Sequence, residues 1–274
     1  MFCRIFLITF IFVVCSFGDV FEPISVPEYN VKKALLGKEL FFDNKLSAKK
    51  RSCQTCHHLK GELTGTVNEK NSSYSILNSS LNFFINEKGE FYPLKEKIIS
   101  QFFDKKLYDT DPVYFLEEIK KNPSYVKMFK EIYEEPNFTN AVDALSEFIL
   151  ALRSPTRFDD YLLGDENALS KEEKEGFEIF VSKGCALCHG GPNLGGSMNI
   201  HATVNEKEIQ LQIPSLRNVL KTKPWSSLYS DDLIYTVLQL KLNLIDINVN
   251  EDEMKKIIVF FGALNSKTPS ILKE

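Results

Sequence analysis

The chain has 274 residues, of which 43% are hydrophobic and 26% charged, a composition typical of globular proteins and unlike that of disordered or fibrous chains. This length suits one large domain or two ordinary ones, and we favour two. A formal net charge of -4 gives no basic excess to neutralise a phosphate backbone, so we expect no nucleic-acid partner.

The first residues are typical of an export signal. A basic start at Arg4 precedes the apolar residues 5–14, which are too few to span a bilayer, and residues 16–18 supply a cleavage site with small residues at both ends. We predict a signal peptide over residues 1–18 and the periplasm of a Gram-negative type of cell as the destination. The alternatives are a retained membrane anchor and a lipoprotein anchored at Cys15, which the preceding valine fits poorly.

Helical patterns dominate the chain after the export segment. Val31–Phe42 is predicted to be a helix, followed by a polar turn over residues 43–47 that leads to the first cysteine motif. Residues 61–89 are rich in Asn, Ser and Gly and are predicted to be mostly loop. No long alternating run indicates a strand, so the predicted fold class is mostly α.

Three further segments carry helix start signals. Thr139 is placed to cap one helix, Ser170 and Glu173 form a capping box before a second, and Asn250 opens the last. The apolar faces at helical spacing are Ala141, Val142, Leu145, Phe148, Ile149 and Leu152 in the first of these helices, and Met254, Ile257, Ile258, Phe261 and Leu264 in the last.

Two Cys-x-x-Cys-His motifs account for every cysteine after the export segment. They are Cys53-Gln54-Thr55-Cys56-His57 and Cys185-Ala186-Leu187-Cys188-His189. Two cysteines three positions apart can both reach the vinyl groups of one haem, and the next histidine lies close enough to ligate its iron. The motifs therefore predict two covalently bound c-type haems, with His57 and His189 as proximal ligands.

Four cysteines could instead hold one zinc ion or form two disulfides. Structural zinc pairs usually lie closer in sequence than these motifs, which are about 130 residues apart, and both alternatives leave the adjoining histidines unexplained. The wide spacing, with helical sequence before each motif, indicates two related modules. We predict two cytochrome c-like helical domains over residues 19–160 and 161–274, each with one haem.

Stretches around and beyond the two motifs form a longer pattern, made up of residues 36–43, 46–47, 52–57, 157–164, 168–170, 184–189, 191–192, 195–196 and 214–219. In this pattern nearly the whole mature chain resembles the bacterial di-haem cytochrome c peroxidase family. In that family a donor reduces the C-terminal haem, electrons pass to the N-terminal haem, and hydrogen peroxide is reduced there to water. The resemblance implies that the partners are hydrogen peroxide and a reduced donor such as a small c-type cytochrome, and it is compatible with a homodimer.

The resemblance also implies a calcium ion between the two domains. Asn78, Thr222 and Pro224 fall at the positions of its ligands. Amide and main-chain carbonyl oxygens suit that hard cation. The alternative is that these residues only shape turns.

The distal ligands of the family have no clear counterparts here. The chain has four histidines, so His58 and His201 remain after the two proximal ligands. His58 directly follows a proximal ligand and is expected at the surface or near the haem propionates, so we expect the first iron to be five-coordinate and open to peroxide. The methionine ligand of the C-terminal haem aligns with Leu240, and Met198 and His201, expected in the loop after the second motif, are the candidates to replace it.

The residues near the peroxide site differ as well. The tryptophan and arginine between the haems of the family align with Glu87 and Glu90, and the acid/base glutamate falls near Lys106. A lysine does not do the work of a carboxylate at neutral pH without a strongly lowered pKa. Glu87 is therefore our candidate catalytic acid, with Asp104 as the alternative.

These departures keep two other functions open. One is an electron carrier or redox sensor that has lost peroxide turnover, because function belongs to the site and not to the fold. The other is a relative of the di-haem enzyme that matures methylamine dehydrogenase, in which a tyrosine ligates one haem. Tyr229 and Tyr235 lie in the corresponding region but do not align with that ligand.

Overall fold

The structure is a computed structural model that describes residues 20–59, 75–82, 84–85, 91–196, 199–204, 207–222, 234, 242 and 247–274. Within these residues, no helix combines the length and the apolar character needed to cross a membrane. For the strand residues, including His201, the backbone alone is described. Several predictions fall outside the described residues: the signal peptide, Glu87, Glu90, Met198, Pro224, Tyr229, Tyr235 and Leu240.

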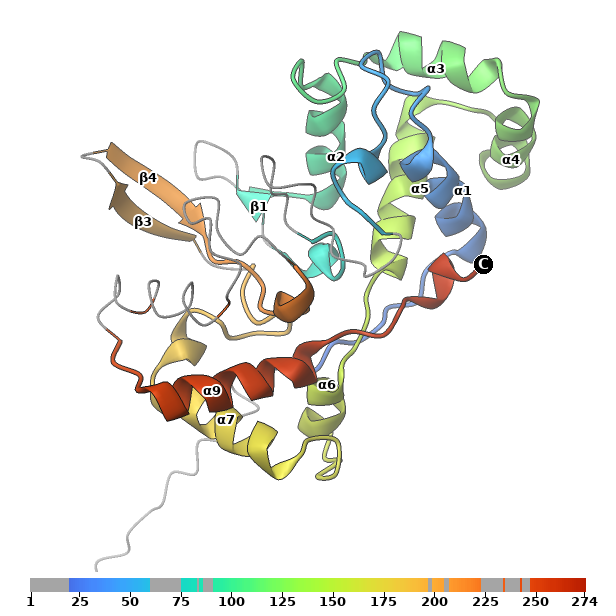
Figure 1. Ribbon diagram of the computed structural model, residues 1–274. Helices are drawn as coiled ribbons and strands as arrows, with labels where there is room; N and C mark the ends of the chain where they lie inside the picture. Colours follow the sequence, from blue (N-terminus) through green and yellow to red (C-terminus); the bar gives the residue numbers. More distant parts are fainter. Residues whose placement is uncertain are drawn as a thin grey trace, which may run out of the picture.

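The described helices fall into two groups, which confirms the mostly α fold (Figure 1). The last helix of the first group, α5, leads directly into α6 of the second. The first group is α1 (Val31–Phe42), α2 (Leu94–Phe103), α3 (Pro112–Lys120), α4 (Pro123–Tyr133) and α5 (Phe138–Ala151). The second group is α6 (Arg157–Leu162), α7 (Lys171–Ser182) and α9 (Glu251–Phe261).

The strands form two antiparallel ribbons. β1 (Phe84–Ile85) pairs with β2 (Phe91–Tyr92), and β3 (Asn199–Val204) pairs with β4 (Lys207–Gln212). The expectation that His201 lies in a loop was wrong, since His201 is in β3 opposite Gln210. The alternation of Ile209 and Leu211 with polar neighbours was the signal of this ribbon in the sequence.

Side-chain caps fix the helix starts, mostly as predicted. The capping box of Ser170 with Glu173 opens α7, and Asn250 opens α9 with Glu253. The cap predicted for α5 was wrong: Asn137, not Thr139, accepts from the Asn140 N–H at 2.8 Å. Asn137 precedes the first helical residue, whereas Thr139 already lies within the first turn.

The two groups are built on the same crossing of two helices. Gly37 in α1 faces Ala144 of α5, and Gly176 in α7 faces Lys256 of α9. At either glycine, a methyl group would overlap the carbonyl oxygen of the facing residue. The bare Cα therefore lets the two backbones approach closely, and the repetition agrees with two related modules.

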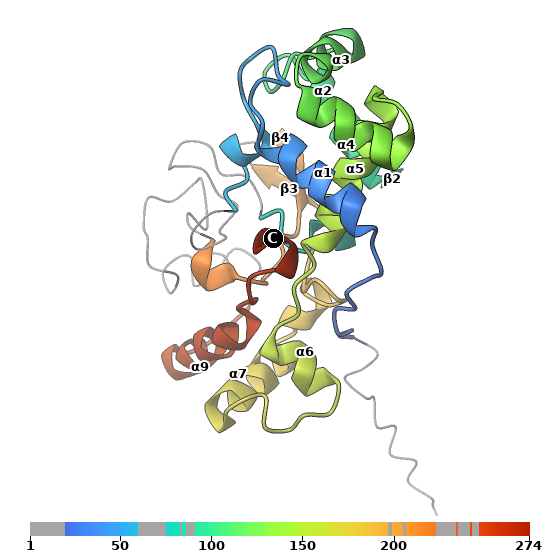
Figure 2. The same ribbon diagram turned by 90° about the vertical axis from the view of Figure 1, so that its right-hand side faces the viewer.

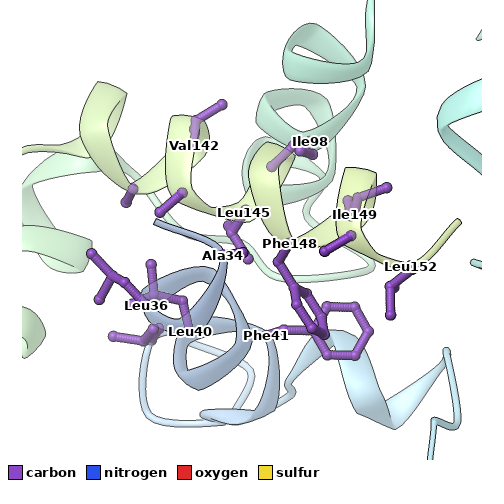
Figure 3. Close-up of a cluster of buried hydrophobic side chains, with 14 of the residues drawn as sticks. Ala34, Leu36, Leu40, Phe41, Ile98, Val142, Leu145, Phe148, Ile149 and Leu152 are labelled. Atoms are coloured by element: carbon purple, nitrogen blue, oxygen red, sulfur yellow. The ribbon is translucent and has the colours of Figure 1, made fainter. Parts of the chain in front are cut away.

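Each crossing carries an aromatic core. Phe41 and Phe148 meet between α1 and α5 with ring centroids 5.2 Å apart (Figure 3). In the second core Phe180 of α7 meets Phe260 of α9 at 5.7 Å. Phenylalanine rings at 5–6 Å with large interplanar angles add edge-to-face attraction to the burial of their area.

The two ends of the described chain cross between the groups. Phe21 packs in the second core, while Ile271 packs in the first, and its carbonyl accepts from the Lys38 ammonium at 3.0 Å. Figures 1 and 2 show the C-terminal segment running from α9 toward α1 and α5. The predicted domain boundary at residues 160 and 161 stays a prediction.

Candidate haem sites

The first motif forms a single tight turn. The Ser52 N–H donates to the Thr55 hydroxyl at 3.0 Å and opens the 3-10 helix Cys53–Thr55. The carbonyl oxygen of Cys53 then accepts from the N–H groups of Cys56 (3.1 Å) and His57 (2.8 Å). These bonds bring both cysteines and the histidine onto one turn, as attachment to one porphyrin requires.

The second motif repeats this turn. Gly184, with a φ of 79°, opens the 3-10 helix Cys185–Leu187. The carbonyl oxygen of Cys185 accepts from the N–H groups of Cys188 (3.3 Å) and His189 (3.0 Å). The side chain of Leu187 between the cysteines is 79% exposed, so this turn lies at the surface.

A backbone carbonyl orients the second histidine. His189 Nδ1 lies 3.2 Å from the carbonyl oxygen of Leu194. Because a carbonyl oxygen only accepts, Nδ1 carries the proton in this hydrogen bond, and Nε2 keeps the lone pair that an iron ligand needs. Leu194 has a φ of 46° and is followed by Gly195 with a φ of 119°, so the loop after the motif is shaped to present this carbonyl.

A buried ion pair anchors the same loop to the rest of the protein. Arg217 donates to both carboxylate oxygens of Asp159 at 2.7 Å, and its Nε donates to the carbonyl oxygen of Pro192 at 2.8 Å. Asp159 also accepts from the Ile24 N–H at 2.7 Å. Burial alone would raise the pKa of Asp159, but the hydrogen bonds and charge of Arg217 hold that pKa below its ordinary value.

The cysteines and histidines of the two motifs fit haem better than a zinc site or a pair of disulfides. None of the four cysteines forms a disulfide. In the part of the chain that the structure describes, no three His, Cys, Asp or Glu side chains converge to hold a metal ion. Burial raises the pKa of the Cys53 thiol to about 11 and also raises that of Cys185. Each turn thus offers two cysteine side chains and an imidazole, the donor set of one c-type haem.

Tyr108 adds an independent sign that the first site is completed by another group. Its hydroxyl is buried beside the Cys53 thiol and has no oxygen or nitrogen partner among the described residues. Buried hydroxyls normally have a partner. A haem attached at Cys53 would fit this requirement.

Two of the predicted calcium ligands, Asn78 and Thr222, lie in or next to a pair of matching turns. Asn78, with a φ of 60°, accepts from the Ser154 N–H at 2.7 Å through its side-chain oxygen. In the second group Asn218, with a φ of 61°, accepts from the Ser266 N–H at 2.7 Å in the same way. Thr222 follows the second of these turns. An amide oxygen has two lone pairs, so Asn78 can anchor Ser154 and still offer one to a cation.

Asp104 and Lys106, at or near the position of the family's acid/base glutamate, make other contacts. The carboxylate of Asp104 accepts from the N–H groups of Lys106 (2.7 Å) and Leu107 (3.2 Å), which commits it to the turn after α2. Lys106 is exposed, and its carbonyl oxygen accepts from Arg51 at 2.8 Å. His58 is half-buried directly after the first motif.

Comparisons with known proteins identify relatives of the chain. The family model described as di-haem cytochrome c peroxidase matches residues 31–167, half of the chain. Among curated proteins, the cytochrome c551 peroxidase of Nitrosomonas europaea is 28% identical over 93% of this chain and 87% of its own length. The cytochrome c peroxidase Ccp of Escherichia coli is 25% identical over 86% of this chain and 58% of its own.

A second kind of relative bears the name of another process, methylamine utilization. The methylamine utilization protein MauG of Methylorubrum extorquens is 26% identical over 71% of this chain and 64% of its own. Solved structures share the fold: a MauG-like protein associated with microbial copper homeostasis superposes with a TM-score of 0.66 at 17% identity, covering 90% of this chain and 93% of that one. The diheme peroxidase BthA of Burkholderia thailandensis superposes with a TM-score of 0.63 at 13% identity, covering 88% of each chain.

Proposed function

Because the chain belongs to the di-haem cytochrome c peroxidase family, we propose that it is a periplasmic enzyme that reduces hydrogen peroxide to water with electrons from a reduced donor such as a small c-type cytochrome. The observation that carries the proposal is the repeated turn, in which one cysteine carbonyl accepts from the N–H groups of the second cysteine and of the histidine at both motifs.

Each of the two haems would be held by the residues of one motif. Cys53, Cys56 and His57 would hold the first haem, and Cys185, Cys188 and His189 the second. When bound, the haems supply one-electron iron chemistry, while the protein sets access, orientation and proton supply. The hydrogen bond from His189 Nδ1 to Leu194 fixes the ring and makes Nε2 a stronger ligand, as second-shell partners do at other metal sites.

Peroxide reduction is assigned to the first site. The sequence holds no histidine between His58 and His189, so the family's distal histidine has no counterpart after the first motif, which supports an open position opposite His57. Glu87 is proposed as the group that supplies protons there. Its alternative, Asp104, is disfavoured because its carboxylate already holds the turn after α2.

Calcium is proposed at Asn78, Thr222 and Pro224. The amide oxygen of Asn78 is fully buried and held in place by Ser154, so a cation there would meet a preorganised ligand. A chelator should therefore change the stability of the loaded protein more than its haem content.

An electron carrier or redox sensor remains the second candidate. It is favoured by one observation at the position of the family's acid, where Lys106 is an exposed cation and the neighbouring Asp104 is committed to a turn. Both candidates share the two haems, so haem content does not separate them.

Stopped-flow mixing of peroxide with fully haem-loaded protein and a reduced donor tests the proposal. The peroxidase predicts donor oxidation that scales with peroxide, and the carrier predicts none. Glu87→Gln should slow the reaction by about 100-fold, the usual contribution of a general acid, and Glu90→Gln is the matched control that should leave the rate unchanged. Donor oxidation at the rate of a peroxide-free blank would reject the enzyme.

A further inference from the structure

Tyr108 is unusual among the described tyrosines with buried hydroxyls. The Tyr125 hydroxyl donates to Asp43 at 2.9 Å, and the Tyr133 hydroxyl donates to Asp143 at 2.8 Å. The Tyr108 hydroxyl is buried without such a partner in the described structure. A buried hydroxyl without a hydrogen bond destabilises the folded protein, so its retention needs a reason.

The backbone holds Tyr108 firmly in this position. Its carbonyl oxygen accepts from the Ser47 hydroxyl (3.0 Å), the Lys49 N–H (3.4 Å) and the Thr110 hydroxyl (2.9 Å). Its ring packs 5.2 Å from Phe102, centroid to centroid. These contacts tie the turn after α2 to the segment that leads into the first motif. The backbone and the ring packing therefore fix the position of the Tyr108 hydroxyl, without a hydrogen bond of the hydroxyl itself to a described oxygen or nitrogen.

Cys53 and Tyr108 both pack against the first core, and the Tyr108 hydroxyl neighbours the Cys53 thiol. Burial is the main cause that raises the pKa of Tyr108, and the next is the neighbouring Cys53. Among the described residues, the second motif shows no such arrangement: after burial, the groups that act on Cys185 are its own backbone, Cys188 and Lys183. Within the described part of the chain, the two otherwise matching turns therefore differ in whether a tyrosine hydroxyl lies at the first cysteine.

Attachment of a haem at Cys53 would give the Tyr108 hydroxyl a hydrogen-bond acceptor. When the Cys53 thiol adds across a haem vinyl group, its hydrogen goes to a vinyl carbon and the sulfur forms the new C–S bond. The resulting thioether sulfur has lone pairs and no proton, so it can only accept a hydrogen bond. The Tyr108 hydroxyl then has a role open to it, as a donor.

We propose that Tyr108 is a positioning residue of the first haem, whose hydroxyl donates a hydrogen bond to the thioether sulfur at Cys53. This inference rests on the proposed attachment of haem at the first motif. Donation to the sulfur withdraws electron density from the edge of the porphyrin and stabilises the electron-rich reduced haem. Tyr108 thus raises the potential of the first haem, and no described tyrosine makes an equivalent contact at Cys185.

The test compares Tyr108→Phe with Tyr125→Phe in fully loaded protein. Both variants remove one buried hydroxyl and keep the ring, but the Tyr125 hydroxyl is paired with Asp43. An EPR-monitored redox titration, which separates the two irons by their spectra, should show a lower potential for the first haem in Tyr108→Phe and unchanged potentials in Tyr125→Phe. Resonance Raman spectra should show a shifted thioether C–S band in Tyr108→Phe alone.

A second variant keeps the test decisive if Tyr108→Phe assembles poorly. Tyr108 replaced by 3-fluorotyrosine is a stronger hydrogen-bond donor and should move the first potential in the opposite direction, upward. An unchanged first potential and C–S band in Tyr108→Phe with two haems attached would overturn the inference while leaving the peroxidase proposal intact. Wild-type protein that carries no haem at Cys53 would overturn both, and haem analysis of proteolytic peptides reports that outcome separately.

Discussion

Replacing Arg217 with methionine should destabilise the loaded protein by about 3–5 kcal/mol, the usual cost of removing one partner of a buried ion pair. Both side chains of the pair are 1% exposed. The variant loses two hydrogen bonds of 2.7 Å to Asp159 and leaves its carboxylate buried without a countercharge. Asp159 keeps hydrogen bonds from the N–H groups of Ile24 (2.7 Å) and Thr156 (2.6 Å), so we expect the lower end of that range.

Arg157→Met is the matched control. Arg157 pairs with Glu173, but its side chain is 46% exposed, and exposed pairs contribute about 0–1 kcal/mol. Urea unfolding at pH 7, followed by haem absorbance, measures the free energy of unfolding of both variants. Equal losses in the two variants, each below about 1 kcal/mol, would refute the reasoning that burial makes the Arg217 pair decisive.

The pH dependence of Arg217→Met has a definite sign. In the wild type the pKa of Asp159 lies below its ordinary value, so this group contributes stability above that value, which is lost as the pH falls through the lower folded pKa. In the variant, burial without Arg217 should raise the folded pKa above the unfolded one. The gap in stability between wild type and variant should therefore narrow as the pH falls from 7 to 4.

Three further predictions concern packing, charge and metal. Gly37→Ala should destabilise the protein by about 1–3 kcal/mol in urea unfolding, because the added methyl overlaps the carbonyl oxygen of Ala144; a loss within experimental error would contradict the close helix crossing. Burial alone would raise the pKa of Asp143, but hydrogen bonds from two lysines and a tyrosine lower it from 3.8 to about 2. Because Asp143 is partly exposed, Asp143→Asn should lower the free energy of unfolding by only about 1 kcal/mol at pH 7, and the stabilities of variant and wild type should become equal near pH 2. Calcium at a hundredfold excess over its Kd should stabilise the wild type by about 2.7 kcal/mol and Asn218→Ala equally, but not Asn78→Ala; equal stabilisation of all three would exclude Asn78 as a ligand.

Local signals in the sequence predicted much of the fold. The bounds of α1, the capping box of α7 and the opening of α9 at Asn250 follow from neighbours within four residues, which a sequence displays directly. The same holds for the two haem turns, whose hydrogen bonds join residues three and four apart. The cap of α5 was misplaced because Asn137 and Thr139 are both good capping residues, and only the backbone geometry separates them.

Long-range contacts were the part that the sequence did not reveal. Arg217 and Asp159 were both within stretches that resemble the family, but their pairing joins residues 58 positions apart. The crossing of Phe21 and Ile271 between the two cores depends on how the groups of helices pack together. Tyr108 had no motif of its own, and its place beside Cys53 follows from hydrogen bonds between two distant turns.

The central claim is that peroxide is reduced at the haem held by His57 with electrons from an external donor. Steady-state oxidation of a reduced small c-type cytochrome by hydrogen peroxide, catalysed by protein shown to carry two haems, tests it most directly. We predict two donor molecules oxidised per peroxide consumed, and loss of that activity in a His57→Gly variant that keeps both haems attached. No peroxide-dependent donor oxidation by the two-haem wild type, or full activity in His57→Gly, would contradict the account.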